Sequence, residues 1–109
     1  MNIFFESVAG MKKPYTESLQ NILRQFQPPF SSGDSVGIKL HWGERGNKGF
    51  LPPDYAKEIA GWLISKGAAP FIFDTTVLDS VDMHTAADAL KMSSDHVYTA
   101  DFLGCPVII

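Results

Sequence analysis

Cysteine is almost absent from this chain, since Cys105 is the only one among 109 residues. One thiol cannot build an internal disulfide framework, and it cannot supply the four thiolates that an iron–sulfur cluster normally takes. Cys105 precedes a proline in an apolar run, so we interpret it as a small buried hydrophobe and not as a nucleophile. The sequence therefore predicts that this chain binds no cofactor, and a cytoplasmic setting is the default.

An excess of basic residues and long apolar runs are also absent. Lys and Arg total 9 against 12 Asp and Glu, so the net charge is −3, whereas nucleic-acid-binding surfaces normally carry a basic face. No apolar run approaches the roughly 20 residues that a membrane-spanning helix needs. Residues 1–6 have neither the basic start nor the long apolar core of a signal peptide. We therefore expect no nucleic-acid partner and no membrane partner.

Short apolar runs alternate with helical patterns along the chain, whose hydrophobic content of 45% is ordinary for a globular domain. The apolar runs predict strands at residues 3–5, 35–40, 69–73 and 105–109. Amphipathic spacing predicts helices over residues 15–27 and 53–66, and less clearly over 82–93. Strands alternating with helices form βαβ units. We therefore predict an α/β fold with a mostly parallel sheet of three to four strands and flanking helices, a Rossmann-like fragment.

The whole chain, residues 1–109, is expected to be one α/β domain. Its end lies inside an apolar run, whereas domains usually end in polar surface segments. We therefore expect the truncated N-terminal part of a larger family domain. A sheet edge left unpaired templates pairing with another chain. This predicts a homo-oligomer through the sheet edge, favoured by the apolar residues Phe71, Phe73, Val107, Ile108 and Ile109.

A glycine-rich polar loop separates the predicted strand 35–40 from the helix that begins near Pro53. Open parallel sheets bind ligands beyond the carboxyl ends of their strands, and glycines let the backbone approach a ligand closely. The order of Gly43, Gly46 and Gly49 matches neither the dinucleotide fingerprint nor the P-loop. The loop predicts a site for a small anionic ligand, and a plain flexible loop is the alternative.

Polar residues from two strand ends are expected to meet at this loop. Lys39 lies in an apolar strand, and a buried ammonium needs a partner, so we expect it to approach Glu44 or Asp74. The alternative is an edge lysine whose stem packs while its ammonium reaches water. His41 and Asn47 are expected to face the same cleft. The predicted ligand-binding residues are Lys39, His41, Gly43, Glu44, Gly46, Asn47, Asp74 and Thr75.

The histidines allow further readings of the same residues. His41, Glu44 and Asp74 could ligate a metal ion through nitrogen and oxygen, although we favour a solvated histidine and a capping carboxylate. His84 and His96 are isolated, so we interpret them as structural or exposed. A binding module is the leading interpretation. The alternatives are a metal-dependent or acid–base enzyme domain, with His41 or Asp74 as the acid–base group, and a truncated oligomerising homologue without activity.

Residues 36–44, with Gly46-Asn47 and Pro53, resemble the core signature of the domain-of-unknown-function 362 family. Phe73-Asp74-Thr75 resembles its second motif, and residues 104–109 resemble its next strand. The resemblance covers nearly the whole chain. It implies an uncharacterised N-terminal portion of an iron–sulfur-associated protein, whose 4Fe-4S clusters would lie in a C-terminal segment missing from this chain. The biochemical activity of the family is not established, so the resemblance supplies no reaction.

The second motif departs from the family pattern. The family has an asparagine after Asp-Thr, and then a glycine, an arginine and an asparagine–alanine pair. This chain has at those positions Thr76, Val81, Met83 and Thr85-Ala86. The guanidinium group of an arginine at that position could bind a carboxylate or phosphate through two parallel hydrogen bonds. The first motif is intact.

Overall fold

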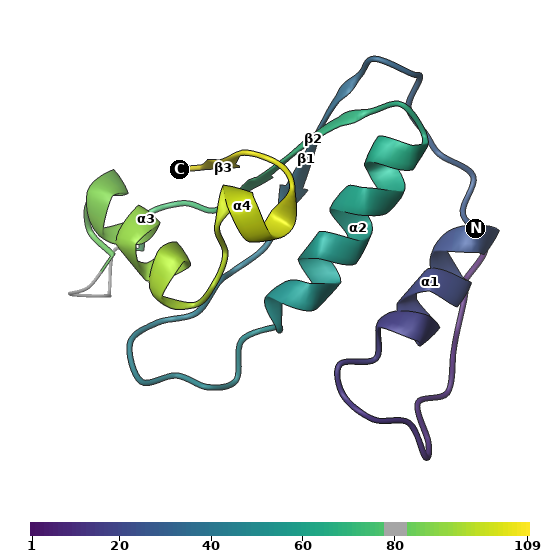
Figure 1. Ribbon diagram of the computed structural model, residues 1–109, viewed down its shortest axis with the longest axis horizontal. Coiled ribbons are helices and arrows are strands. Elements are labelled where there is room, and N and C mark those ends of the chain that lie inside the picture. The colour runs from purple at the N-terminus through teal and green to yellow at the C-terminus, as the bar shows by residue number, and fades with distance from the viewer. Residues whose placement is uncertain (78–82) are drawn as a thin grey trace.

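The computed structural model describes residues 1–77 and 83–109 of the chain. Three strands form a parallel sheet in the order β1-β2-β3, so β2 is the central strand (Figure 1). The strands are β1 (Ser35–Lys39), β2 (Ala69–Phe73) and β3 (Val107–Ile108). The predicted α/β fold, a parallel three-stranded sheet with flanking helices, is confirmed.

Helices α1 (Thr16–Gln25), α2 (Pro53–Ser65), α3 (Ala86–Asp95) and α4 (Ala100–Leu103) accompany the sheet. α2 packs on β1 and β2, and it lies between α1 and α4 (Figure 1). Pro53 begins α2, where its missing N–H is no loss, and Gly67 follows the helix with a φ of +86°. In the part of the chain that the structure describes, no helix is long and apolar enough to cross a membrane.

The two faces of the sheet differ in burial. Ile38 and Ile72 point toward the helices and belong to the core or pack against it. On the opposite face, Gly37 is exposed and the rings of Phe71 and Phe73 lie 5.7 Å apart. A Cβ added at Gly37 would come within 2.9 Å of both rings. The second face therefore carries two part-buried aromatic rings and is more open to solvent than the first.

The core centres on Trp42, which is fully buried and lies three residues after the end of β1. It packs with Tyr98, whose ring centroid is 6.4 Å away, and with Ile72 and Ala60 in the same apolar cluster. Burial also raises the pKa of the Cys105 thiol, which is 6% exposed. The interpretation of Cys105 as a buried small hydrophobe is confirmed.

The strand predicted over residues 3–5 is wrong for this structure, in which those residues are irregular. Ile3 and Phe5 are 84% and 85% exposed. A strand is stable only beside another strand that accepts its hydrogen bonds. An apolar run reveals the propensity for a strand but not the neighbour it needs.

The helix predicted over residues 82–93 is also corrected, because α3 begins at Ala86. Thr85 caps α3 by accepting a hydrogen bond from the Asp88 N–H, in a reciprocal capping box. Ala89 and Met92 are the buried apolar residues of α3, whereas Leu90 is 43% exposed. Residues 81 and 82, which enter the family comparison and the predicted helix, lie outside the described residues.

Candidate functional site

Asp74 is the centre of the candidate site, directly after β2. Its side chain is only 3% exposed. Lys39 Nζ lies 2.5 Å from its Oδ1, His41 Nδ1 lies 3.0 Å from its Oδ2, and the Thr75 N–H donates to Oδ1 at 2.8 Å. The predicted approach of Lys39 to a carboxylate is therefore confirmed, and Asp74 is the partner.

The sheet register explains why these side chains meet. Lys39 is the Cα partner of Phe73, so the residues that follow β1 and β2 leave the sheet side by side. The Leu40 N–H donates to the Phe73 carbonyl at 3.3 Å, and the Asp74 N–H donates to the Ile108 carbonyl at 3.4 Å. Asp74 is thereby held at the carboxyl edge of the sheet, where ligands of such folds bind.

The protonation of Asp74 follows from its surroundings. Burial alone would raise the pKa of its carboxyl, but the hydrogen bonds from Lys39, the Thr75 N–H and His41 outweigh burial and lower the pKa below its ordinary value. Asp74 is therefore an anion at neutral pH. The side chains of Lys39 and His41 are 50% and 47% exposed. A buried carboxylate thus fixes two half-exposed side chains.

The glycine loop between β1 and α2 is shaped by two left-handed glycines. Gly43 has a φ of +92° and is buried, and a Cβ added there would lie 2.7 Å from the Phe50 ring. Gly46 has a φ of +77° with open space around it. The Asn47 side chain accepts a hydrogen bond from the Gly49 N–H at 2.7 Å. Asn47 thus stabilises a turn inside the loop, and its place in a ligand cleft stays a prediction.

Two of the three predicted metal ligands, His41 and Asp74, are in contact. Among residues 1–77 and 83–109, no group of three or more His, Cys, Asp or Glu side chains is arranged to hold a metal ion. Glu44 instead takes part in the loop through its backbone, since its carbonyl accepts from the Asn47 N–H at 3.0 Å. A divalent ion would also have to displace the Lys39 ammonium from Asp74. The metal hypothesis stays a prediction, with less support than an anion site.

Two residues outside the predicted site hold both ends of the glycine loop. His96 Nδ1 lies 2.7 Å from the Trp42 carbonyl, and the Tyr98 hydroxyl donates to the Leu51 carbonyl. The His96 ring also stacks on Phe50, with centroids 4.2 Å apart and planes 10° from parallel. The interpretation of His96 as structural is confirmed, but no pattern in the sequence predicts that His96 and Tyr98 hold the two ends of the loop.

Val97, between these two residues, has a left-handed backbone with a φ of +67°. A β-branched residue rarely adopts this conformation, and it persists where the surrounding structure requires it. Here it lets His96 and Tyr98 reach the two ends of one loop. Burial, with a smaller effect from the Asp54 charge, raises the pKa of Tyr98 to about 12, so its hydroxyl stays a donor. A left-handed valine leaves no recognisable signal in a sequence.

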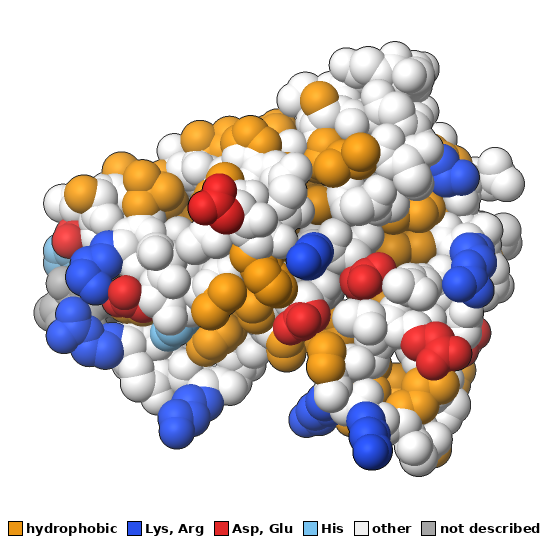
Figure 2. Space-filling model, in the orientation of Figure 1, with side chains coloured by type: hydrophobic (Ala, Val, Ile, Leu, Met, Phe, Trp, Pro, Cys, Tyr) orange, Lys and Arg blue, Asp and Glu red, His pale blue; other side chains and the backbone are white. Residues whose placement is uncertain are grey.

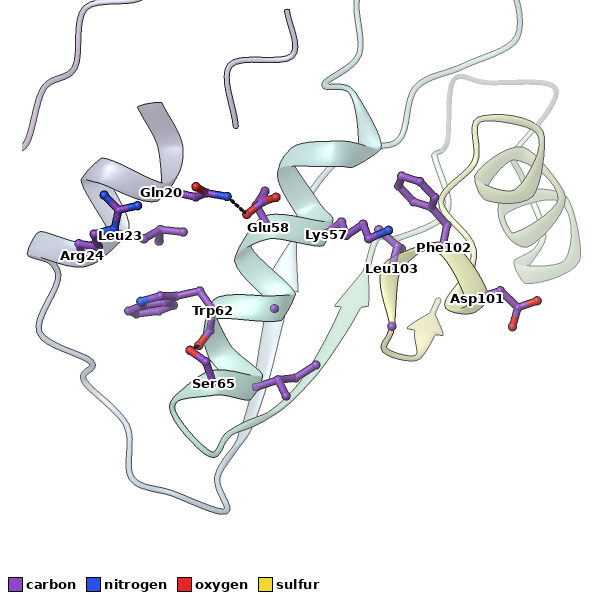
Figure 3. Close-up of a pocket in the computed structure, with 13 residues that line it drawn as sticks. Gln20, Leu23, Arg24, Lys57, Glu58, Trp62, Ser65, Asp101, Phe102 and Leu103 are labelled. Atoms are coloured by element: carbon purple, nitrogen blue, oxygen red, sulfur yellow. Dashed lines mark hydrogen bonds between the residues drawn. The ribbon is translucent and has the colours of Figure 1, made fainter. Parts of the chain in front are cut away.

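A separate hollow of about 680 Å³ lies over α2, between α1 and α4 (Figure 3). Gln20 donates to Glu58 across it at 2.8 Å, and the Lys57 ammonium lies 4.5 Å from the centroid of the Phe102 ring. Charged side chains of both signs alternate with apolar ones on this side of the molecule (Figure 2). No single ligand chemistry is favoured there, so the Asp74 site remains the candidate.

Comparisons of the chain with protein-family models, with curated proteins and with solved structures found no match. They therefore assign no role to any residue of the site. The function of the site can therefore be inferred only from its geometry and its charged side chains, and the family resemblance of residues 36–44 stays a prediction.

Proposed function

We propose that this chain is a binding module for a small anionic ligand at the carboxyl edge of its parallel sheet. The observation that supports this best is the pair Lys39 and His41, both half-exposed and both fixed on the buried carboxylate of Asp74. The Lys39 ammonium has N–H groups left to donate, and a fixed donor binds an anion more strongly than a mobile one because less conformational entropy is lost on binding. His41 donates to an anion through Nε2 only when its ring is protonated, because the hydrogen on Nδ1 is directed at Asp74. The glycine loop adds backbone N–H groups that can approach the ligand.

The resemblance of residues 36–44 to the domain-of-unknown-function 362 family supports a wider proposal. The module would be the N-terminal portion of a cytoplasmic iron–sulfur-associated protein, with the 4Fe-4S clusters held by a segment outside these 109 residues. Cys105, the single cysteine, is buried. The chain would then contribute ligand recognition, and the other segment would contribute redox chemistry.

Inorganic phosphate is a direct probe of the proposed site. We expect phosphate to shift the amide NMR signals of the glycine loop, and we expect Lys39→Met to weaken phosphate binding about tenfold, because a hydrogen bond to a charged group is worth roughly 1.5–3 kcal/mol. Lys57→Met is the matched control, since it removes the same charge from α2. Affinity is measured by NMR titration at low ionic strength.

Equal phosphate affinity in the Lys39 and Lys57 variants would contradict the proposed role of Lys39. A wild-type chain without saturable phosphate binding would contradict the anion site itself. That result would favour the third interpretation, a structural and oligomerising homologue without a ligand.

An acid–base enzyme is the second candidate, and one contact favours it. His41 Nδ1 lies 3.0 Å from Asp74 Oδ2, and a carboxylate can only accept a hydrogen bond, so the proton of the neutral ring lies on Nδ1. Nε2 then carries the lone pair and can take a proton from a bound molecule. The same arrangement of a buried aspartate and a histidine orients the general base in catalytic triads.

The tautomer of His41 can be measured directly. At a pH where the ring is neutral, we expect the nitrogen chemical shifts of His41 to show the proton on Nδ1. Asp74→Asn should reduce this preference, because the carboxylate that fixes Nδ1–H is gone. The exposed His84 serves as the reference ring in the same spectra. A proton on Nε2 of His41 in the wild-type chain would exclude Nε2 as the general base.

Self-association through a sheet edge is the assembly that we propose. β1 and β3 each have one edge without a strand neighbour among the described strands. Ile108 and Ile109 beside one of these edges are 45% and 37% exposed. Unpaired edges flanked by apolar side chains support association with another chain.

A further inference from the structure

The outer edge of β1 carries backbone groups that point away from the sheet. Within the described residues, β1 pairs with β2 alone. The Asp34 carbonyl and the Leu40 N–H bond to the β2 side, and hydrogen-bonding groups alternate sides along a strand. The N–H and C=O groups of Ser35, Gly37 and Lys39 therefore face outward. They form an edge on which another parallel or antiparallel strand could pair.

An apolar cavity of about 400 Å³ adjoins β1 at this side, between α1 and α2. Most of its wall is formed by apolar side chains, which include Leu19, Ile22, Ile38, Leu40 and Ile59. Glu6 and Val8, which follow the N-terminal apolar run, also line it. A strand added to β1 would therefore have a place for the apolar side chains on its inner face.

The N-terminal segment, residues 2–6, has the features of such a strand. Ile3 and Phe5 are two residues apart, so they share one face of an extended chain, and both are more than four-fifths exposed. In a single copy, Phe4 packs on Phe26 beyond the end of α1, with ring centroids 5.4 Å apart. This contact leaves Ile3 and Phe5 in water while the cavity beside β1 stays open.

We propose that two copies of this chain exchange their N-terminal segments, so that each segment adds a strand to the β1 edge of the other copy. Ile3 and Phe5 would enter the apolar cavity, and the backbone of the segment would bond to the outward groups of Ser35, Gly37 and Lys39. A reciprocal exchange gives a closed dimer, in which both segments and both edges are covered. The inference rests on the proposed self-association and is independent of ligand binding.

The test combines the oligomeric state with hydrogen exchange of individual amides. Light scattering should show a wild-type dimer, with slow exchange at the outward amides of Gly37 and Lys39. The double variant Ile3→Asp, Phe5→Asp should be a monomer, with exchange at these two amides at least tenfold faster. Exchange at Ile72, in the central strand, should stay unchanged. Both substituted residues are exposed in a single copy, so the variant keeps its fold.

The control is Leu90→Asp, which places one negative charge instead of two, at an exposed apolar position of α3, and should leave the dimer intact. A wild-type monomer with fast exchange at Gly37 and Lys39 overturns the proposal. A monomer in which these amides are protected also overturns it, because the segment then docks on its own copy. A dimer that persists in the double variant also overturns the proposal, because its interface then does not depend on Ile3 and Phe5. Titration of the double variant with inorganic phosphate reports on the ligand site separately.

Discussion

Replacing Asp74 with asparagine should lower the free energy of unfolding by about 2–4 kcal/mol at neutral pH, because it weakens several charge-assisted hydrogen bonds at once. The carboxylate accepts from Lys39, His41 and the Thr75 N–H. An amide of the same shape has no charge and only one accepting oxygen. Because Lys39 and His41 are half-exposed, water solvates them in the variant, which keeps the loss below that of a fully buried pair. Urea unfolding measures the difference.

The pH dependence of the free energy of unfolding should also report on the Asp74 carboxyl. The pKa of Asp74 is lowered in the folded chain relative to its ordinary value of 3.8. Its stabilising contribution is therefore fully present above about pH 4, and it is lost as the pH falls through the lower pKa of the folded state. The Asp74→Asn variant should lack this part of the acid destabilisation.

Asp95→Asn is the control for both measurements. Asp95 is exposed and pairs with Lys91 one helical turn away at 2.7 Å, and such surface pairs contribute little. The variant should therefore differ far less from the wild type. Equal losses for the two substitutions would mean that Asp74 does not organise the site.

Gly43→Ala should destabilise the chain by about 2–4 kcal/mol, because it combines a left-handed backbone with an overpacked neighbour. The added methyl group would lie 2.7 Å from a carbon of the Phe50 ring. Phe50 cannot yield easily, since its ring stacks on His96. The substitution should therefore loosen the loop where it leaves β1. It should also reduce the phosphate-induced shifts of loop amides.

Gly46→Ala separates the two causes. Gly46 has a comparable φ of +77°, but no atom lies within 4 Å of the position that a Cβ would take. Its substitution should cost only about 1–2 kcal/mol, the price of the left-handed backbone alone. The two variants are compared by thermal or urea unfolding. If Gly46→Ala proved as damaging as Gly43→Ala, the contact with Phe50 would not be what fixes the loop.

The contact between Lys39 and Asp74 could be predicted from sequence because it depends on regular elements. Two apolar runs with a helical pattern between them imply parallel strands, and parallel strands bring their carboxyl ends to one edge. A lysine in one run and a carboxylate after the other are then neighbours. Whether Glu44 or Asp74 would be the partner could not be decided, because it depends on the course of an irregular loop.

The roles of His96 and Tyr98 could not be predicted for a related reason. They follow α3 in a segment without clear periodicity, and both bond to backbone carbonyls, whose positions no sequence pattern reveals. The strand expected over residues 3–5 shows the opposite difficulty. Its composition favours a strand, yet pairing is a property of two segments. The propensity of one segment does not determine whether the other is available.

Trp42 and Leu51, at the two ends of the glycine loop, are both attached to the short segment of residues 96–98. This attachment determines which changes of sequence the loop can accept. The two carbonyls are held by His96 and Tyr98, so the ends of the loop keep their separation whatever lies between them. Lengthening a flexible loop whose ends are fixed costs little, about 0.6 kcal/mol for each doubling of its length. Insertions and deletions within residues 44–49 should therefore be tolerated, and the loop is a place where new specificity can be grafted while Lys39, His41 and Asp74 stay in position.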